Sequence, residues 1–228
     1  MKKIAVIVAG GSGKRMGREI PKQFLPIFHK PILWYSIKAF VEAYSDIEII
    51  LVCHQDHLKE GKNIVADFSN KKIQIIKGGI TRFDSVKAGL SLIQEKSMVF
   101  VHDAVRCLVS QVLIKRCYED ALKNGNAIPA ITSTDSMRML KDGKYAIVNR
   151  EEMKIIQTPQ VFLSEIILPA FQQENSGDFT DEASVAEASG NKIFLTEGEF
   201  ENIKITRPMD ILLAKQVIES RNRAFVNK

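Results

Sequence analysis

The chain has 228 residues, of which 45% are hydrophobic and 26% are charged, as in soluble globular proteins and unlike disordered, collagenous or coiled-coil chains. A chain of this length buries roughly 70% of its unfolded surface, so one domain can form a core without disulfides. Lys and Arg number 32 against 27 Asp and Glu, a formal net charge of +5. This modest excess suits anionic substrates, but the cations are spread along the sequence, so we expect no nucleic-acid partner.

Two features concern the compartment. The three cysteines, Cys53, Cys107 and Cys117, are an odd number without metal-ligand spacing, which favours a reducing environment. The first apolar run, Ile4–Ala9, is too short for a signal-peptide core or a membrane span. We therefore expect a cytoplasmic protein that makes no membrane contact.

Short apolar runs rich in Val and Ile are typical of parallel strands that are buried on both faces. Such runs occupy Ile4–Ala9, Ile47–Cys53, Ile73–Ile76, Met98–Val101 and Ala127–Ile131. Between them, apolar residues recur at helical spacing over 33–44, 83–93 and 113–121. The alternation predicts an α/β fold with an open, doubly wound, mostly parallel sheet, whose ligands bind outside the carboxyl ends of the strands.

Two helix-start signals support this alternation. Thr81 followed by Asp84 forms a capping-box pattern, and Thr206 followed by Pro208 predicts that the last helix begins there. The preceding segment, 201–206, alternates in polarity and is interpreted as a strand. It carries Lys204, which needs an anionic partner if it points inward.

Residues 133–150 interrupt the alternation. They are polar and contain the turn sequence Lys141-Asp142-Gly143-Lys144, which predicts a projecting β-hairpin arm. Because an isolated hairpin cannot bury its own residues, we expect two copies to exchange arms in a homodimer. A loose surface insertion is the alternative. The whole chain, 1–228, is otherwise assigned to a single domain.

Glycines and cations follow the first predicted strand. The segment 9–17 contains several glycines together with Lys14 and Arg15, and Pro21-Lys22-Gln23 follows. Glycines allow backbone N–H groups to face a phosphate, and three cations in one loop favour a triphosphate. The spacing fits neither a Walker A loop nor a dinucleotide fingerprint. A simple tight turn is the alternative, although it would not require the cations.

Polar residues also follow the third and fourth predicted strands. Gly78-Gly79 stands before Thr81, Arg82 and Ser85, and can offer donors to a base or ribose; an ordinary turn before a capped helix is the alternative. Asp103 can bind Mg²⁺ that bridges nucleotide phosphates, and Arg106 can position a neighbouring loop. Alternatively, these last two residues pair to fix a turn.

The fourth predicted strand also contains His102, between apolar neighbours. We interpret it as a buried histidine with satisfied hydrogen bonds and no chemical role. A phosphate monoester dianion is already a nucleophile, so its reaction with a triphosphate needs charge neutralisation more than a base.

These segments resemble the 2-C-methyl-D-erythritol 4-phosphate cytidylyltransferases of the non-mevalonate isoprenoid pathway over nearly the whole chain. Six blocks occur in the family's order. They are 9–17 with 21–23, 78–79 with 82 and 84–86, 101–104 with 106, 157–160, 180–183, and 202–206.

The resemblance implies a Rossmann-like nucleotidyltransferase domain, a homodimer whose arm completes the partner's site, and Mg²⁺ as the cofactor. The implied reaction joins CTP to methylerythritol phosphate and releases pyrophosphate. The implied catalytic cations around the α-phosphate are Arg15, Lys22 and Lys204. Nucleotide contacts fall on Ala9, Gly10, Gly11, Gly13, Gly79, Arg82, Ser85, Asp103 and Ala104. Sugar-phosphate contacts fall on Arg106, Asp135, Ser136, Arg150, Thr158 and Thr180, with Ser136 and Arg150 offered across the dimer.

Some residues depart from the family pattern, and other functions remain alternatives. Cys107 replaces a usual proline, Ser136 a threonine and Arg138 a frequent lysine. Ribitol 5-phosphate cytidylyltransferases share three of the blocks, so ribitol phosphate is the alternative acceptor. An NADP-dependent reductase would need a ribose-binding acid and a Tyr-Lys pair. A non-catalytic nucleotide-binding protein would not need Lys22 and Lys204 on opposite sides of one phosphate.

Overall fold

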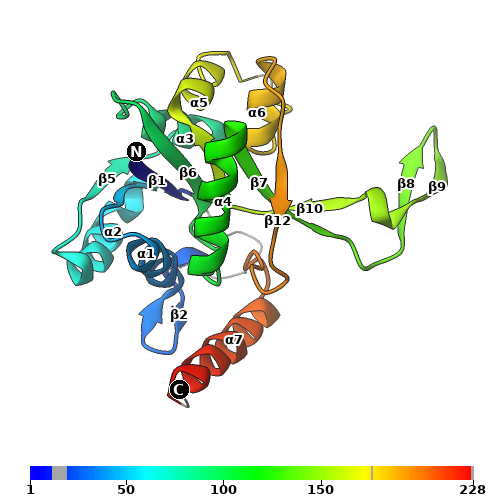
Figure 1. Ribbon diagram of the computed structural model, residues 1–228. Helices are drawn as coiled ribbons and strands as arrows, with labels where there is room; N and C mark the ends of the chain where they lie inside the picture. Colours follow the sequence, from blue (N-terminus) through cyan, green and yellow to red (C-terminus); the bar gives the residue numbers. More distant parts are fainter. Residues whose placement is uncertain (12–19, 176, 227–228) are drawn as a thin grey trace.

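The computed structural model describes residues 1–11, 20–175 and 177–226. The central sheet is formed by β1 (Lys2–Ala9), β4 (Glu48–Cys53), β5 (Ile73–Lys77), β6 (Ser97–Asp103), β7 (Asn126–Thr132), β10 (Lys154–Ile156), β11 (Gln160–Leu163) and β12 (Leu195–Glu197). In the described part of the chain this sheet has eight strands, in the order β10-β7-β11-β6-β1-β4-β5 with β12 paired to β7. Figure 1 shows helices on both sides of it.

The strands β1, β4, β5 and β6 form the parallel part of the sheet. β1 lies between β4 and β6 and pairs parallel with both, while β5 pairs parallel with β4. Along β1, Ala5 and Ile7 face one hydrophobic core, whereas Ile4 and Val6 face the other. Side chains alternate across a strand, so both faces must be apolar when both are covered by helices. The predicted doubly wound α/β fold is confirmed.

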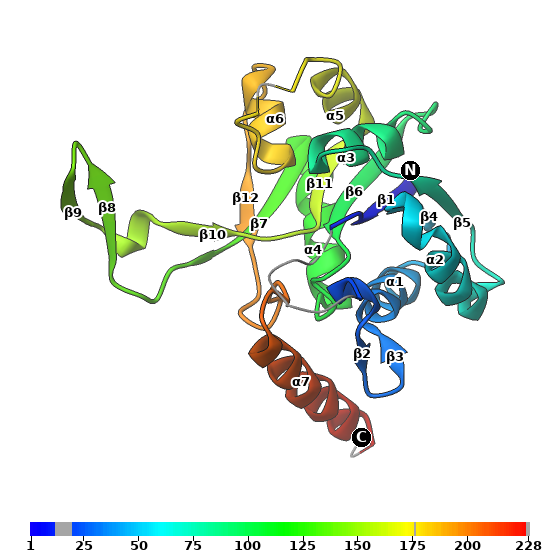
Figure 2. The same cartoon turned by 180° about the vertical axis from the view of Figure 1, so that it is seen from behind.

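Two groups of helices cover the two faces of this sheet. The first core contains α1 (Ile32–Ala43), α2 (Leu58–Val65) and α4 (Gln111–Asn124). The second contains α3 (Arg82–Leu90), α5 (Ser164–Ala170) and α6 (Glu182–Ala188), which Figure 2 shows from behind. Phe40 of α1 meets Phe100 of β6 edge-on, with ring centroids 5.9 Å apart, a favourable aromatic geometry. The predicted capping box of Thr81 and Asp84 is confirmed at the start of α3.

The other half of the sheet differs from the prediction. β11, which has only four residues, lies between β6 and β7 and pairs antiparallel with both. β10 also pairs antiparallel with β7, and β12 pairs parallel with it. β11 gave no strand signal because it is short and begins with a buried glutamine. The sheet is therefore mixed, although the half formed by β1, β4, β5 and β6 is parallel.

The predicted strand at 201–206 is wrong, because this segment forms no strand. Its contacts come from loops and side chains rather than from a neighbouring strand. The Ile205 N–H donates to the Val105 carbonyl at 3.0 Å. The Asn202 side chain donates to the Thr158 carbonyl at 2.9 Å. The alternating polarity does not mark one buried side, because the two fully buried residues, Asn202 and Ile205, are three positions apart.

The predicted arm is confirmed as a projecting hairpin of β8 (Met137–Lys141) and β9 (Lys144–Val148), which pair antiparallel. Asp142 and Gly143 have φ angles of 50° and 75°, and positive φ at both central residues matches the twist of a tight hairpin. Apolar side chains stay exposed on this arm, including Tyr145 at 70% and Ile147 at 79%. None of the described residues buries them.

The last helix, α7 (Pro208–Val226), begins where the sequence predicts. The Asp210 carboxylate accepts the backbone N–H groups of Thr206 and Arg207 at 2.7 and 2.8 Å, which caps the helix start. Ala214 packs in a third core with Ile27 of β2 (Pro26–Ile27), which forms a short hairpin with β3 (Lys30–Pro31), and with residues of the loop after β6. Among the described residues, no helix has both the length and the hydropathy that a bilayer span needs.

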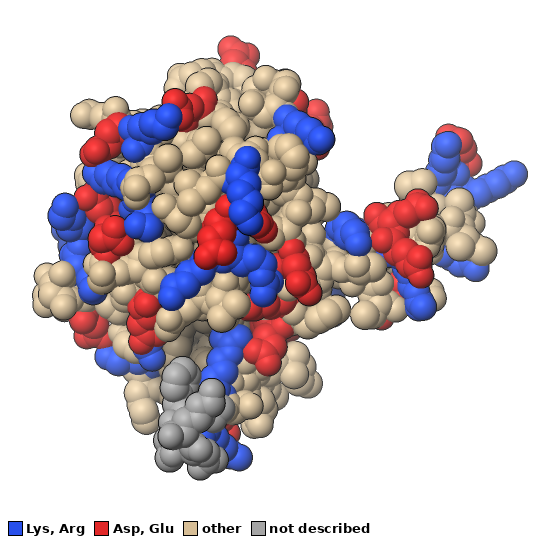
Figure 3. Space-filling view, viewed as in Figure 1, with Lys and Arg blue, Asp and Glu red and all other residues tan. Residues whose placement is uncertain are grey.

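Charged side chains cover the visible surface in a mixed pattern. On the face shown in Figure 3, Lys and Arg side chains are interspersed with Asp and Glu side chains over both the body and the arm. Neither sign of charge forms a continuous patch on this face.

Candidate active site

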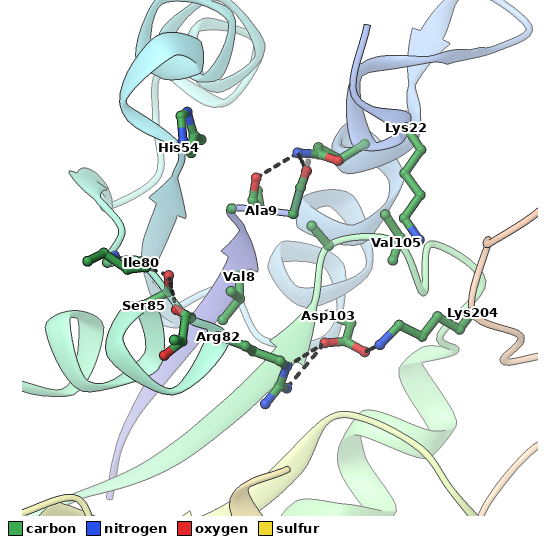
Figure 4. A pocket seen from close by; sticks show the side chains of 16 residues that line it. Val8, Ala9, Lys22, His54, Ile80, Arg82, Ser85, Asp103, Val105 and Lys204 are labelled. Atoms are coloured by element: carbon green, nitrogen blue, oxygen red, sulfur yellow. Dashed lines mark hydrogen bonds and ion pairs between the residues drawn. The ribbon is translucent and has the colours of Figure 1, made fainter. Parts of the chain in front are cut away.

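A pocket of about 510 Å³ opens at the carboxyl ends of β1 and β6, where an open α/β sheet binds its ligands. Figure 4 shows its walls, which come from the two glycine loops, from the end of β6 and from the segment before α7. The lining residues are Val8, Ala9, Gly10, Gly11, Lys22, Gln23, His54, Gly79, Ile80, Thr81, Arg82, Ser85, Asp103, Ala104, Val105 and Lys204.

The first glycine loop is held by a glutamine to which the sequence gave no role. The buried Gln23 amide donates to the carbonyls of Ala9 and Gly11 at 2.7 and 2.9 Å. Gln23 follows Lys22 in the 3-10 helix Lys22–Phe24. Its bonds turn the strand end toward that helix, so Gly10 and Gly11 line the pocket. The predicted site residues Gly13 and Arg15 lie outside the described residues.

The second glycine loop forms the opposite wall. The Gly79 N–H donates to the Ser85 hydroxyl at 3.2 Å, and that hydroxyl donates to the Thr81 carbonyl at 2.9 Å. A Cβ atom on Gly79 would lie 2.2 Å from the Cβ atom of Asp84, so this close approach requires glycine. The loop is thus both a capped turn and a pocket wall, and the two interpretations of Gly78-Gly79 do not conflict.

Asp103, the last residue of β6, is the centre of a charge cluster. Its Oδ1 atom accepts from Arg82 Nε and Nη2 at 3.3 and 3.2 Å, and its Oδ2 atom lies 2.8 Å from Lys204 Nζ. Burial alone would raise the pKa of Asp103, but the charges of Arg82, Lys204 and Arg106 outweigh burial and hold this pKa well below its usual value. Asp103 is therefore ionised, and it supplies the anionic partner that Lys204 was expected to need.

The same Arg82 guanidinium binds a second carboxylate. Its Nη1 and Nη2 atoms donate to the two carboxylate oxygens of Glu182 at 2.5 and 3.1 Å. Glu182 is fully buried. Burial would lower the pKa of Arg82, but Glu182 and Asp103 together raise it above its ordinary value. The sequence gave Glu182 no role, since its only signal is its place in the block 180–183.

The two predicted catalytic lysines in the described part of the chain converge on the pocket. Lys22 is buried, and its Nζ atom donates to the Ile205 carbonyl at 2.8 Å across 183 positions of sequence. Lys204, the residue before Ile205, reaches Asp103 from the side opposite to Arg82 (Figure 4). Tertiary structure therefore places two cations at one end of the sheet.

Arg106 binds backbone groups behind the pocket. Its guanidinium donates to the carbonyls of Asn202 and Ile156 at 2.8 and 3.1 Å, which confirms that it positions a neighbouring loop. Its Nε atom lies 3.8 Å from Asp103 Oδ2. This Nε is one of the buried polar atoms that lack a hydrogen-bond partner among the described residues. A direct contact of Arg106 with substrate stays a prediction.

Thr158 and His102 form a buried hydrogen-bonded chain. Thr158 Oγ1 lies 3.0 Å from His102 Nδ1 and accepts the Asp103 N–H at 3.1 Å, while His102 Nε2 lies 3.2 Å from the Arg106 carbonyl. This network assigns the ring proton to Nε2. Burial lowers the pKa of His102 to about 3, so the ring is neutral. The expected buried, satisfied histidine is confirmed. Thr158 uses its hydroxyl internally, and its contact with substrate stays a prediction.

The other predicted acceptor residues lie away from this pocket within one chain. Asp135 and Ser136 are exposed at the base of the arm, and Arg150 is exposed with its Nη1 donating to the Thr134 carbonyl at 3.3 Å. Thr180 is exposed in the segment before α6. Figures 1 and 2 both show the arm pointing away from the body. None of these four residues lines the described pocket.

Comparison with known proteins gives one family. The model of the 2-C-methyl-D-erythritol 4-phosphate cytidylyltransferase family matches residues 3–220. Proteins with that name from Bacteroides thetaiotaomicron and Lachnospira eligens are 42% and 40% identical to this chain. The first match covers 96% of this chain and 100% of the relative; the second covers 92% and 96%.

Solved structures agree with this assignment. The 4-diphosphocytidyl-2C-methyl-D-erythritol synthase of Anaerococcus prevotii matches with a TM-score of 0.82 at 28% identity, over 96% of this chain and 99% of that one. The cytidylyltransferase of Thermus thermophilus matches with a TM-score of 0.75 at 26% identity, over 95% and 99%. The described pocket lies within the matched residues. The chain therefore belongs to the 2-C-methyl-D-erythritol 4-phosphate cytidylyltransferase family.

Proposed function

We propose that this protein transfers the cytidylyl group of CTP to 2-C-methyl-D-erythritol 4-phosphate, giving 4-diphosphocytidyl-2-C-methyl-D-erythritol and pyrophosphate. The observation that carries the proposal is the convergence of Lys22, Asp103 and Lys204 on one pocket between two glycine loops. Family membership supports the identity of both substrates, because the matching relatives carry the acceptor in their name.

In this reaction an oxygen of the acceptor phosphate attacks the α-phosphorus of CTP. A new P–O bond forms as the bond to the bridging oxygen breaks, and the electron pair leaves with pyrophosphate. The attacking dianion needs no base, so the protein's task is to hold the reactants in line and to offset the added negative charge. Lys22 and Lys204 supply fixed positive charges at the pocket for this purpose.

The glycine loops are proposed to bind the nucleotide. Ala9, Gly10 and Gly11 on one wall and Gly79 on the other bring backbone groups to the pocket surface, where side chains would block a close approach. Ser85 is occupied in supporting the Gly79 loop. We therefore assign selection of the base mainly to backbone groups of these two loops.

The residues of the pocket fit a magnesium ion that is held mainly by the triphosphate. Asp103 is the one carboxylate among the described pocket residues, and no described group of three His, Cys, Asp or Glu side chains could hold a metal alone. Mg²⁺ is commonly bound by one or two carboxylates together with substrate phosphates. When bound, it would neutralise charge on the triphosphate, with Asp103 as its protein ligand.

We also infer a homodimer in which the arms exchange. The exposed apolar side chains of β8 and β9 support it, because an isolated hairpin gains stability only when another surface covers it. Exchange would also bring Ser136 and Arg150 to the partner's acceptor phosphate.

A cytoplasmic location is supported by the three free, buried cysteines. Burial raises the pKa of the Cys53 and Cys107 thiols to about 12.

Pyrophosphate release tests the proposed function. The purified protein is mixed with Mg²⁺, CTP and either methylerythritol phosphate or ribitol 5-phosphate, with UTP and ATP as alternative donors. We expect rapid release only with CTP and methylerythritol phosphate. Lys22→Ala should abolish most of the rate, while Lys59→Ala, which changes an exposed lysine of α2, should not. Preference for ribitol 5-phosphate would show that it is the acceptor instead of methylerythritol phosphate. No release with either acceptor would refute the transferase assignment.

A further inference from the structure

Glu182 is a fully buried carboxylate that the proposed reaction does not use. It is the first residue of α6, and both of its carboxylate oxygens accept hydrogen bonds from Arg82. Burying an ion pair usually gives little stability compared with apolar side chains of similar size. A buried Glu–Arg pair next to the pocket therefore calls for an explanation beyond stability.

The backbone around Glu182 is fixed from two directions. Asp181 caps α6 by accepting the Ser184 N–H at 2.9 Å. Gln160 of β11 donates to the Asp181 carboxylate at 2.9 Å and accepts the Ala183 N–H at 2.8 Å. Glu182 thus stands between two residues that Gln160, in an inner strand of the sheet, holds in place. Its carboxylate therefore has a fixed position, unlike that of an exposed glutamate.

Arg82 connects the fixed Glu182 carboxylate to the pocket. Its guanidinium is planar, and four donated hydrogen bonds join it to Glu182 and to the Oδ1 atom of Asp103. Two bonds to each carboxylate fix the plane of the group as well as its position. Because Oδ1 of Asp103 is held on this side, Oδ2 faces Lys204 at 2.8 Å. The orientation of Asp103 depends on Arg82, and that of Arg82 depends on Glu182.

We propose that Glu182 is a positioning residue, which fixes Arg82 so that Asp103 presents its second oxygen to the Lys204 side of the pocket. The inference rests on the proposed cytidylyl transfer, since its main effect is on the rate of that reaction. Without the Glu182 charge, Arg82 has one anionic partner instead of two. Its guanidinium can then turn toward the phosphates, and Asp103 loses its fixed orientation.

The test is a double-mutant cycle of Glu182→Gln and Arg82→Gln. For Glu182→Gln we expect kcat to fall on the order of 10- to 100-fold, because misplacing a group by about 1 Å can reduce the rate about 10²-fold. The KM for CTP should change less than about 3-fold, and each chain should still bind one CTP, because the glycine loops remain intact. Glu187→Gln, an exposed position on the same helix, should leave all three values unchanged.

The cycle also tests the route of the effect. If Glu182 acts only through Arg82, adding Glu182→Gln to Arg82→Gln should not lower kcat at saturating CTP by more than about 2-fold. This comparison uses only the Arg82→Gln variant and the double variant, so it holds even if the single Glu182 variant fails to fold. The proposal is overturned if Glu182→Gln lowers kcat in the Arg82→Gln variant by the same factor as in the wild type. The proposal would also be overturned if kcat of Glu182→Gln fell only in proportion to the fraction of chains that still bind CTP. Inactive wild-type protein would instead refute the proposed function.

Discussion

Replacing Lys204 with methionine should separate catalysis from stability. The Lys204 ammonium lies 2.8 Å from Asp103 Oδ2, and its side chain is 39% exposed. Removing one fixed charge that acts on the transition state should lower kcat by about 10²- to 10³-fold, or about 3 to 4 kcal/mol. The folded state should lose only about 0.2 to 1 kcal/mol, because the pair is partly exposed and Asp103 keeps its bonds to Arg82.

The measurement is pyrophosphate release at saturating substrates, together with thermal unfolding of the same preparation. For a chain of this size, a loss of about 1 kcal/mol shifts the melting temperature by roughly 2 to 4 °C. Lys59→Met, an exposed change on α2, controls for the loss of one positive charge. The reasoning is refuted if kcat stays within about 10-fold of the wild type. It is also refuted if the melting temperature falls far enough to account for the lost activity.

Three further predictions follow from other parts of the structure. Burial lowers the pKa of His102 to about 3, so its contribution to stability is complete above about pH 6.5 and falls by about 1.4 kcal/mol per pH unit below it. Urea unfolding at pH 7.5 and 5.5 should show this slope, and His102→Gln should reduce it. Gly79→Ala should weaken CTP binding at least about 10-fold in calorimetry, because its Cβ atom would lie 2.2 Å from that of Asp84; unchanged affinity would exclude this wall from the nucleotide site. Ile147→Asp should shift a dimer to monomer in sedimentation velocity, since Ile147 is 79% exposed on the arm; a monomeric wild-type protein would contradict arm exchange.

Patterns within a few residues of one another predicted the parallel half of the fold and the arm. In β1, apolar residues face both directions, as Ile4 and Ala5 do, which occurs only where both sheet faces are covered. Asp142-Gly143 specified a tight turn, because these residue types tolerate the positive φ angles found there. The carboxyl end of β6 also placed Asp103 correctly, since open α/β sheets bind ligands at that edge.

Contacts between distant segments decided the rest. β11 enters the sheet between β6 and β7 because of its neighbours, since its four residues carry too little pattern to be recognised. Likewise, 201–206 has the polarity of a strand, but no strand of the sheet pairs with it. Strand pairing depends on partners far away in sequence, so local polarity cannot determine it.

The charge cluster was also beyond the reach of local patterns. In the sequence, Glu182 is one acidic residue among 27, and a lone glutamate is usually a solvated surface group. The packing of α6 buries it opposite Arg82, 100 positions earlier in the chain. The sequence by itself determined which charged groups are present and which strand ends carry them. Tertiary structure alone decided which charges meet, because ion pairing depends on distance in space and on burial rather than on separation along the chain.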